Sequence, residues 1–215
     1  MNYQHKIKWL KSRLTQPLPG RIAQQRMAPR LLPDVPDAPP TARVSAVLCL
    51  LFPIDNVLNV LLIKRMEDKS AHSGQVSFPG GSKDASDIDL KATALREAEE
   101  EVGINTADVE IIGELTPLYI PVSNFSVHPF VGYAHERLTY KLSTNEVASI
   151  MEVPLKELCH ESAKTKVEVT SPALPGIVRE VNAYKLEDGT IIWGATAMML
   201  SELETVMAEY PYNYK

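Results

Sequence analysis

A short run of acidic residues constrains this chain of 215 residues more than any other feature. Four glutamates fall within Leu95–Ile104, a segment that ends in Gly-Ile. On an α-helix successive residues advance by about 100°, so Glu97, Glu100 and Glu101 share one face about 100° wide. The apolar side chains of the segment fall on a separate arc that can pack against a core, namely Leu95, Ala98 and Val102. The pattern predicts a helix with one apolar face and one face of carboxylates.

The neighbouring residues mark the ends of this predicted helix. Asp87 or Asp89 can cap its start, because a short polar side chain accepts a hydrogen bond from a free N–H of the first turn. Gly103 suits the left-handed position that follows many helices. We therefore predict a helix from about Asp89 to Val102.

Carboxylates gathered on one face repel each other unless positive charge offsets them. Hard divalent cations prefer oxygen ligands, and Mg²⁺ usually keeps several waters while it also binds substrate phosphates. Glu97, Glu100 and Glu101 are therefore candidate ligands for such a cation, at a site that activates water and neutralises a diphosphate. The alternative is a solvated acidic helix with ion pairs along its surface, for example between Arg96 and Glu100.

The rest of the chain predicts a mixed α/β domain. Residues 44–52 and 57–65 have the pattern of strands joined by the turn Pro53–Asn56, which predicts a hairpin. Residues 66–82 are expected to form a polar loop ending in Phe-Pro-Gly-Gly. Further strands are expected near 109–118, 127–134, 147–153, 178–185 and 190–193, with a short helix at Pro154–Leu158 and a last helix from about Ala195 to Ala208. The regular alternation of a doubly wound fold is missing.

The first 42 residues are expected to form an arm that packs on a domain at residues 43–210. Ile7, Leu10 and Leu14 have helical spacing, and four prolines within 31–40 predict an extended linker. Residues 1–33 hold seven Lys or Arg and no acid. A nucleic-acid contact, a transit peptide or a helix beside an anionic site would fit this charge, but a solvated basic face is the simpler interpretation.

The two cysteines and the apolar segments indicate where such a chain works. Cys49 lies inside the apolar run Ala46–Phe52 and is expected to be buried, and with Cys159 as its only companion no disulfide framework or zinc site is predicted. A reducing, cytoplasmic location is the simpler inference. No apolar run approaches the length of a membrane span, so no membrane partner is expected. No nucleic-acid partner is expected either, because a solvated face is the simpler interpretation of the basic residues 1–33.

The acidic segment and the glycines before it resemble the Nudix box. Its second half, Arg-Glu-aliphatic-x-Glu-Glu-x-Gly-aliphatic, matches Arg96–Ile104 without a gap. The first half departs: counted back from Arg96, the box glycine and acid fall on Ser82 and Ile88. Counted forward from Gly81, the acid falls on Asp87, with one residue too many before Arg96.

The resemblance implies a Nudix fold, an α/β/α sandwich with a mixed β-sheet, and a hydrolase that uses Mg²⁺ or Mn²⁺. It implies that Glu97, Glu100 and Glu101 bind the metal or adjoin the attacking water. It also implies that Arg96 orients a glutamate and that the backbone of Gly81 approaches the metal. Nudix enzymes often take a general base from a later loop, which makes Glu146 the candidate. An exposed or capping glutamate is the alternative for Glu146.

Residues before the box resemble the coenzyme A diphosphatase branch of the family, through Leu61–Arg65 and His72–Gly81. That branch cleaves the diphosphate of coenzyme A to 4′-phosphopantetheine and adenosine 3′,5′-bisphosphate. The extra residue in the box also fits it. Coenzyme A has a 3′-phosphate besides its diphosphate and needs several cations, for which the candidates are Arg65, Lys64, Lys69 and His72. A solvated strand end is the alternative for Arg65, and a loop hydrogen bond for His72.

Two rival functions stay open at this stage. One is another Nudix reaction, on ADP-ribose, a nucleotide sugar or an oxidised nucleotide. The other is a binding module with this fold and no catalysis, although such a module would not need three clustered glutamates. The partner is expected to be a small molecule in either enzyme, and a homodimer is left open.

Overall fold

The computed structural model describes residues 3–29, 37–67, 73–171 and 174–211. An eight-stranded mixed sheet forms its centre, with β1 antiparallel to β2 and β4 and parallel to β7. The strands of this sheet are β1 (Arg43–Ile54), β2 (Val57–Arg65), β3 (Val76–Ser77), β4 (Gly80–Ser82), β5 (Val109–Glu114), β6 (Leu118–Ile120), β7 (Phe125–Ala134) and β8 (Val147–Pro154). The predicted strands near 109–118, 127–134 and 147–153 are thus confirmed. The loop predicted at 66–82 contains two short strands that the sequence did not reveal, β3 and β4.

The hairpin of β1 and β2 forms where the sequence predicted it. Asp55 and Asn56 both have positive φ, 48° and 64°, which matches the two central residues of a type I′ turn. Asp and Asn tolerate this conformation better than most residues. The turn sets the register, in which Leu51 pairs with Val60 and Ile54 with Val57.

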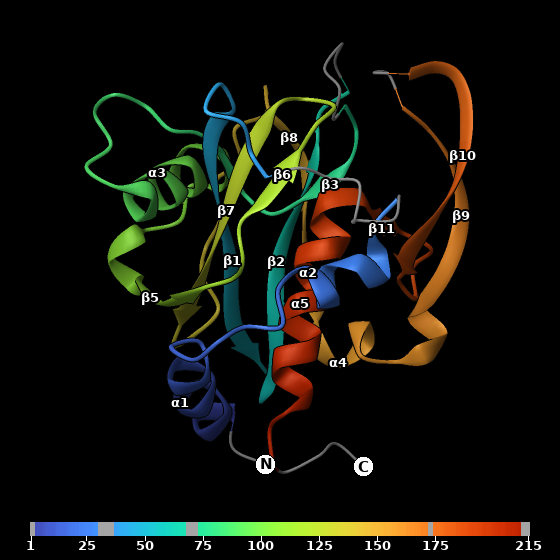
Figure 1. Ribbon diagram of the computed structural model, residues 1–215. Helices are drawn as coiled ribbons and strands as arrows, with labels where there is room; N and C mark the ends of the chain where they lie inside the picture. The colour runs from blue at the N-terminus through green and yellow to red at the C-terminus, as the bar shows by residue number, and fades with distance from the viewer. Residues whose placement is uncertain (1–2, 30–36, 68–72, 172–173, 212–215) are drawn as a thin grey trace.

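One helix, α3 (Leu90–Val102), covers one face of the sheet (Figure 1). Its apolar side packs on β1, with Ala98 and Val102 fully buried. Asp89 caps its start by accepting a hydrogen bond from the Ala92 N–H at 2.8 Å. Gly103 ends it at φ 66°, a conformation that costs most other residues free energy. The predicted helix and both of its boundaries are confirmed.

The other face of the sheet is covered by α5 (Gly194–Ala208), with α1 (Tyr3–Arg13) and α2 (Arg21–Gln24) beside it (Figure 1). Helices on both faces make the predicted α/β/α sandwich. The buried carboxylate of Glu202 on α5 accepts hydrogen bonds from the Gly20 N–H at 3.1 Å and from Gln24 Nε2 at 2.9 Å. It also accepts one from Thr116 Oγ1 at 2.6 Å. Together these bonds tie the first residues of the chain to the domain.

A second sheet of three strands follows α4 (Leu155–Leu158). It contains β9 (Lys164–Ser171), β10 (Leu174–Lys185) and β11 (Ile191–Trp193), all antiparallel. The sequence predicted strands at the last two positions but neither β9 nor a separate sheet. Short 3₁₀ helices complete the described chain: η1 (Gln25–Met27), η3 (Thr106–Asp108) and η4 (Glu161–Ala163).

Several expectations about the chain as a whole stand as follows. Cys49 is buried and both cysteines are free. No helix of the described ranges is long and apolar enough to cross a bilayer. Most of the proline-rich linker predicted at 31–40 lies outside the described residues. The division at residue 42 and a homodimer stay predictions.

Candidate active site

A cavity of about 720 Å³ opens where α3, β4 and β6 meet the start of α5 and the wall of the second sheet. Glu97 and Glu101 of α3 line it beside Gly81, and Glu146 lies at the same end. Apolar side chains from β6, β7 and α5 line much of the remainder, among them Leu118, Val127, Met198 and Met199. The cavity therefore joins a carboxylate cluster to an apolar chamber.

Glu101 is the most enclosed of the cavity carboxylates. Its side chain is 3% exposed, and it accepts a hydrogen bond from the Gly80 N–H at 2.8 Å. Arg65 lies 3.4 Å from it, a long ion pair. Burial raises the pKa of Glu101 to about 7, and the neighbouring Glu97 and Glu146 add to the rise. A positive charge in the cavity would lower this pKa again.

Glu97 lies one helical turn before Glu101 and also faces the cavity. Burial raises its pKa, Arg96 lowers it, and Glu100 and Glu146 raise it further. The main chain of Gly81 runs directly against this carboxylate, so that a Cβ on Gly81 would overlap the Glu97 oxygens. A larger residue at position 81 would therefore displace the Glu97 carboxylate from its present place, which gives a physical reason for the glycine that the box resemblance singled out.

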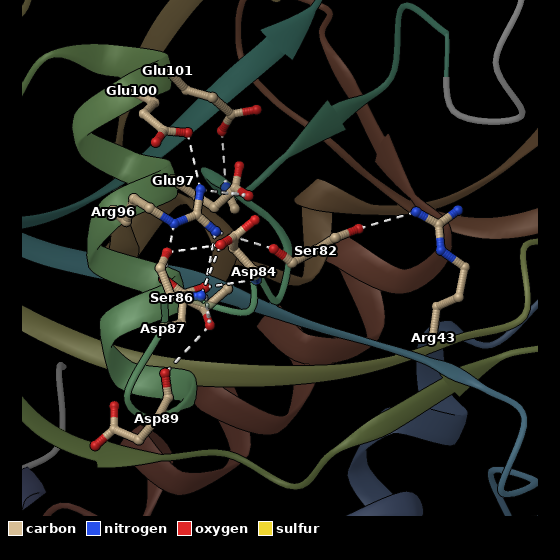
Figure 2. Close-up of polar contacts among 12 residues, drawn as sticks. Arg43, Ser82, Asp84, Ser86, Asp87, Asp89, Arg96, Glu97, Glu100 and Glu101 are labelled. Carbon is tan, nitrogen blue, oxygen red and sulfur yellow. Dashed lines mark hydrogen bonds and ion pairs between the residues drawn. The ribbon is translucent and has the colours of Figure 1, made fainter.

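Arg96 fixes the position of this part of the helix (Figure 2). Its Nε and Nη2 donate to the two oxygens of Asp87 at 2.9 and 3.0 Å. Its Nη2 also donates to the Ser82 carbonyl at 3.1 Å, while Nη1 lies 3.1 Å from Glu97 and 3.0 Å from Glu100. One guanidinium thus joins the turn before α3 to two glutamates on it.

These contacts explain the role of Asp87, the acid whose spacing from Arg96 departs from the Nudix box. The Asp87 side chain is 4% exposed, and Arg96 is the main cause of a pKa well below its usual range. Thr93 Oγ1 also donates to Asp87 at 2.9 Å. Asp87 therefore holds Arg96 and does not line the cavity of the described residues. The sequence had left its role open.

Glu100 differs from the two glutamates beside it. Its side chain is 56% exposed, pairs with Arg96, and is not among the cavity-lining residues of the described ranges. The pairing of Arg96 with Glu100 was predicted from their spacing. A helical wheel puts Glu100 about 100° away from Glu101, on the side turned from the cavity. Its role as a metal ligand stays a prediction.

The donor set at this end of the cavity fits a hard divalent cation. It offers the Glu97 and Glu101 carboxylates and the main chain of Gly81, all oxygen ligands of the kind Mg²⁺ and Mn²⁺ accept. No three His, Cys, Asp or Glu side chains gather at ligand distance anywhere in the described chain. Mg²⁺ commonly binds through one or two carboxylates plus water and substrate phosphates, so two suffice.

Glu146, predicted from a later loop, is brought to the same place. It immediately precedes β8, and its carbonyl accepts the Met66 N–H at 2.9 Å, which ties that loop to the end of β2. Its carboxylate is close enough to raise the pKa of both Glu97 and Glu101. The structure thus places at one cavity three carboxylates that lie up to 49 positions apart (146 minus 97), within electrostatic range of each other.

The four cations predicted for substrate binding have different positions. Arg65 lines the cavity and contacts Glu101. Lys64 is exposed and absent from the lining of the described cavity, since successive residues of a strand point to opposite faces. Lys69 and His72 lie outside the described residues. Among the lining residues that the sequence analysis missed is Arg179 on β10, which belongs to no local motif.

Comparisons with known proteins agree with this geometry. A model of the NUDIX domain matches residues 42–174. The chain is 38% identical over 148 residues to a protein of Citrobacter koseri described as uncharacterized Nudix hydrolase NudL, over 67% of this chain and 72% of that protein. Its identity to a Yersinia enterocolitica protein of the same description is 34% over 191 residues, which covers 88% and 86%. A solved MutT/nudix family protein from Enterococcus faecalis shares the fold, with a TM-score of 0.53 at 16% identity over 82% of this chain and 67% of that one.

Proposed function

Because this chain belongs to the Nudix hydrolase family, we propose that it cleaves the diphosphate of coenzyme A or a close derivative. The products would be 4′-phosphopantetheine and adenosine 3′,5′-bisphosphate. Its α/β/α sandwich with a mixed sheet is the fold that the sequence resemblance predicted. Hydrolysis is the reaction of the family, and the proposal concerns the substrate and the residues.

The observation that carries the proposal is the carboxylate cluster at one end of the cavity. Glu97 and Glu101 are enclosed, and burial raises the pKa of each, with Glu146 adding to both shifts. Such a cluster is costly unless a cation and an anionic substrate complete it. Nudix hydrolases generally use divalent metal ions, and the oxygen donors here fit one.

Each residue would act as follows on a diphosphate bound at that end. Glu97 and Glu101 would hold the cation, which when bound neutralises phosphate charge and makes water more acidic. Glu146, at the end of a different loop, would accept the proton of the attacking water. Arg96 would keep Glu97 in place without touching the substrate, because its donors are occupied by Asp87, Ser82 and the glutamates.

The shape of the cavity supports coenzyme A over a compact nucleotide. A substrate whose diphosphate lies beside Glu97 must also fill an apolar chamber lined by residues such as Leu118 and Met198. The pantetheine arm is long and has few charged groups, which suits such a chamber. The segments Leu61–Arg65 and His72–Gly81, which resemble the coenzyme A branch, support the same choice.

A substrate panel tests the proposal. Coenzyme A and ADP-ribose are offered with Mg²⁺ and with Mn²⁺, and products are identified by mass spectrometry in ¹⁸O-labelled water. We expect turnover of coenzyme A, with label in one product of the diphosphate cleavage. Turnover of ADP-ribose with coenzyme A untouched would reject the proposed substrate.

Two variants of α3 test the residues. Glu97→Gln is expected to lower kcat by at least about 100-fold, the scale of losing one group that stabilises the transition state. Glu99→Gln is the matched control, because Glu99 is an exposed glutamate of the same helix outside the lining of the described cavity. Equal rates for both variants would contradict a role for the cavity carboxylates.

A further inference from the structure

Two cations line the cavity within the described residues, Arg65 and Arg179. Arg65 is engaged by the buried carboxylate of Glu101. No hydrogen bond or ion pair joins Arg179 to any residue in the part of the chain that the structure describes. Arg179 is therefore the cavity cation that the protein itself leaves available to a ligand.

The second sheet directs Arg179 into the cavity. Residues two apart on a strand share a face, and directly paired residues of antiparallel strands share one too. Arg179 pairs with Val169, and Val181 lies two positions further along β10; all three line the cavity. The intervening Glu180 lies on the opposite face, where Lys166 Nζ donates to it at 2.8 Å. The cavity face of this strand pair therefore presents a guanidinium between valines.

Such surroundings favour an anionic partner for Arg179. Val169 and Val181 offer it no hydrogen bonds, and neighbouring apolar groups strengthen an ion pair by lowering the local polarity. Arg179 is half-buried, so part of its hydration is already lost. Guanidinium donors match the oxygens of a phosphate in a two-point contact.

The wall that carries Arg179 is distinct from the carboxylate end. Glu97 and Glu101 belong to α3, which lies on the opposite side of the molecule from β10 (Figure 1). Both belong to one cavity, so a single substrate can touch both. An anion held by Arg179 is then a group other than the diphosphate being cleaved.

We propose that Arg179 binds a phosphomonoester of the substrate and so selects nucleotides that have one in addition to the diphosphate. This inference rests on the proposed function, in which that group is the 3′-phosphate of coenzyme A. Arg179 is then a specificity-determining residue that the Nudix box and the segments before it do not contain. A charge-assisted contact of this kind corresponds to roughly 10- to 150-fold in affinity.

The kinetic test compares coenzyme A with 3′-dephospho-coenzyme A, which differs by that phosphate alone. The wild type is expected to prefer coenzyme A in kcat/KM by the factor above, mainly through KM. Arg179→Gln is expected to lose this preference, because kcat/KM falls for coenzyme A and stays unchanged for 3′-dephospho-coenzyme A. Arg179→Lys keeps the positive charge, and its preference for coenzyme A is expected to lie between those of the wild type and Arg179→Gln.

A matched control and a binding measurement complete the test. Lys166→Gln removes a positive charge from the other face of the same strand pair and is expected to behave as wild type. Calorimetry follows the binding of adenosine 3′,5′-bisphosphate and of adenosine 5′-monophosphate, without turnover. Arg179→Gln is expected to lower the affinity for the bisphosphate by roughly 10- to 150-fold and to leave the affinity for the monophosphate unchanged. The melting temperature of the protein is expected to stay unchanged.

The outcomes separate this inference from the proposed function. An equal loss on both substrates in Arg179→Gln, or a wild type that does not discriminate between them, overturns the role of Arg179 and leaves coenzyme A hydrolysis standing. A wild type that cleaves neither substrate rejects the proposed function. In that case the bisphosphate titration still decides whether Arg179 binds a phosphomonoester.

Discussion

Replacing Glu101 by glutamine is expected to stabilise the metal-free protein while it abolishes metal-dependent hydrolysis. Burial raises the pKa of Glu101 from 4.5 to about 7, so the folded protein holds this proton more tightly than the unfolded chain. Between these values the unfolded chain is ionised first, and the free energy of unfolding therefore falls as the pH rises. Above pH 7 the loss is complete. Glutamine has no such penalty at any pH.

The size of the effect follows from the contacts of Glu101. The difference of about 2.5 pKa units corresponds to ~3 kcal/mol at pH 8. This value already includes the opposing effects of the Gly80 N–H and of Arg65, which both lower the pKa of Glu101, and glutamine Oε1 can still accept the Gly80 N–H. The expected gain is therefore ~3 kcal/mol, or a melting temperature higher by about 6–12 °C for a chain of this size.

Scanning calorimetry in EDTA measures this directly, at pH 5 and at pH 8. The difference between Glu101→Gln and the wild type is expected to be small at pH 5 and full at pH 8. The exposed Glu99→Gln serves as the control and is expected to show no such pH dependence. Added Mn²⁺ is expected to raise the melting temperature of the wild type but not of Glu101→Gln. A glutamine variant less stable than the wild type at pH 8 in EDTA would refute the reasoning.

Three further predictions concern Gly81 and Asp87 beside the site and the buried Glu202 on α5. Gly81→Ala places a Cβ against the Glu97 carboxylate, so we expect a fall in kcat of about 100-fold or more with secondary structure by circular dichroism unchanged; full activity would mean that this carboxylate can move freely. Asp87→Asn releases Arg96 from its strongest partner, so kcat is expected to fall. The pKa of Asp87 is lower in the folded protein than its ordinary value of 3.8. The stabilisation by the ionised carboxylate is therefore fully present above pH 3.8 and is lost as the pH falls from there through the folded-state pKa. Acid titrations of unfolding should therefore be flatter for Asp87→Asn, and identical curves would argue against the pairing. Glu202→Gln sets an amide NH₂ against the donors of Gly20, Gln24 and Thr116. We therefore expect the free energy of unfolding, measured with urea, to fall by about 2–4 kcal/mol. A fall under about 0.5 kcal/mol would show that this buried network is not coupled to stability.

Local sequence determined the elements whose signals lie within a few residues of each other. The α3 helix is defined by its cap at Asp89, its αL glycine at Gly103 and an apolar arc between them, and all three hold in the structure. The β1–β2 hairpin likewise follows from two strand patterns around Asp55-Asn56. The strand β9 was missed because its residues alternate Lys, Thr and Glu with two valines, a pattern that a solvated segment also shows.

Sequence also placed the glutamates on one helical face but could not say how that face meets its surroundings. A helical period fixes the directions of Glu97, Glu100 and Glu101 relative to their own helix. The packing of α3 on β1 and β4 decides that Glu101 is enclosed while Glu100 reaches solvent and pairs with Arg96. The role of Asp87 depends in the same way on how the preceding turn folds back on the helix.

Only the tertiary structure joined distant segments into one site. Glu146 reaches α3 because β8 pairs with β2, and Arg179 reaches the cavity because the second sheet packs beside the start of α5. Neither residue has a local pattern that distinguishes it from any exposed Glu or Arg. Short-range spacing encodes the direction of a side chain within its element, whereas strand pairing and helix packing between distant segments decide which directions converge.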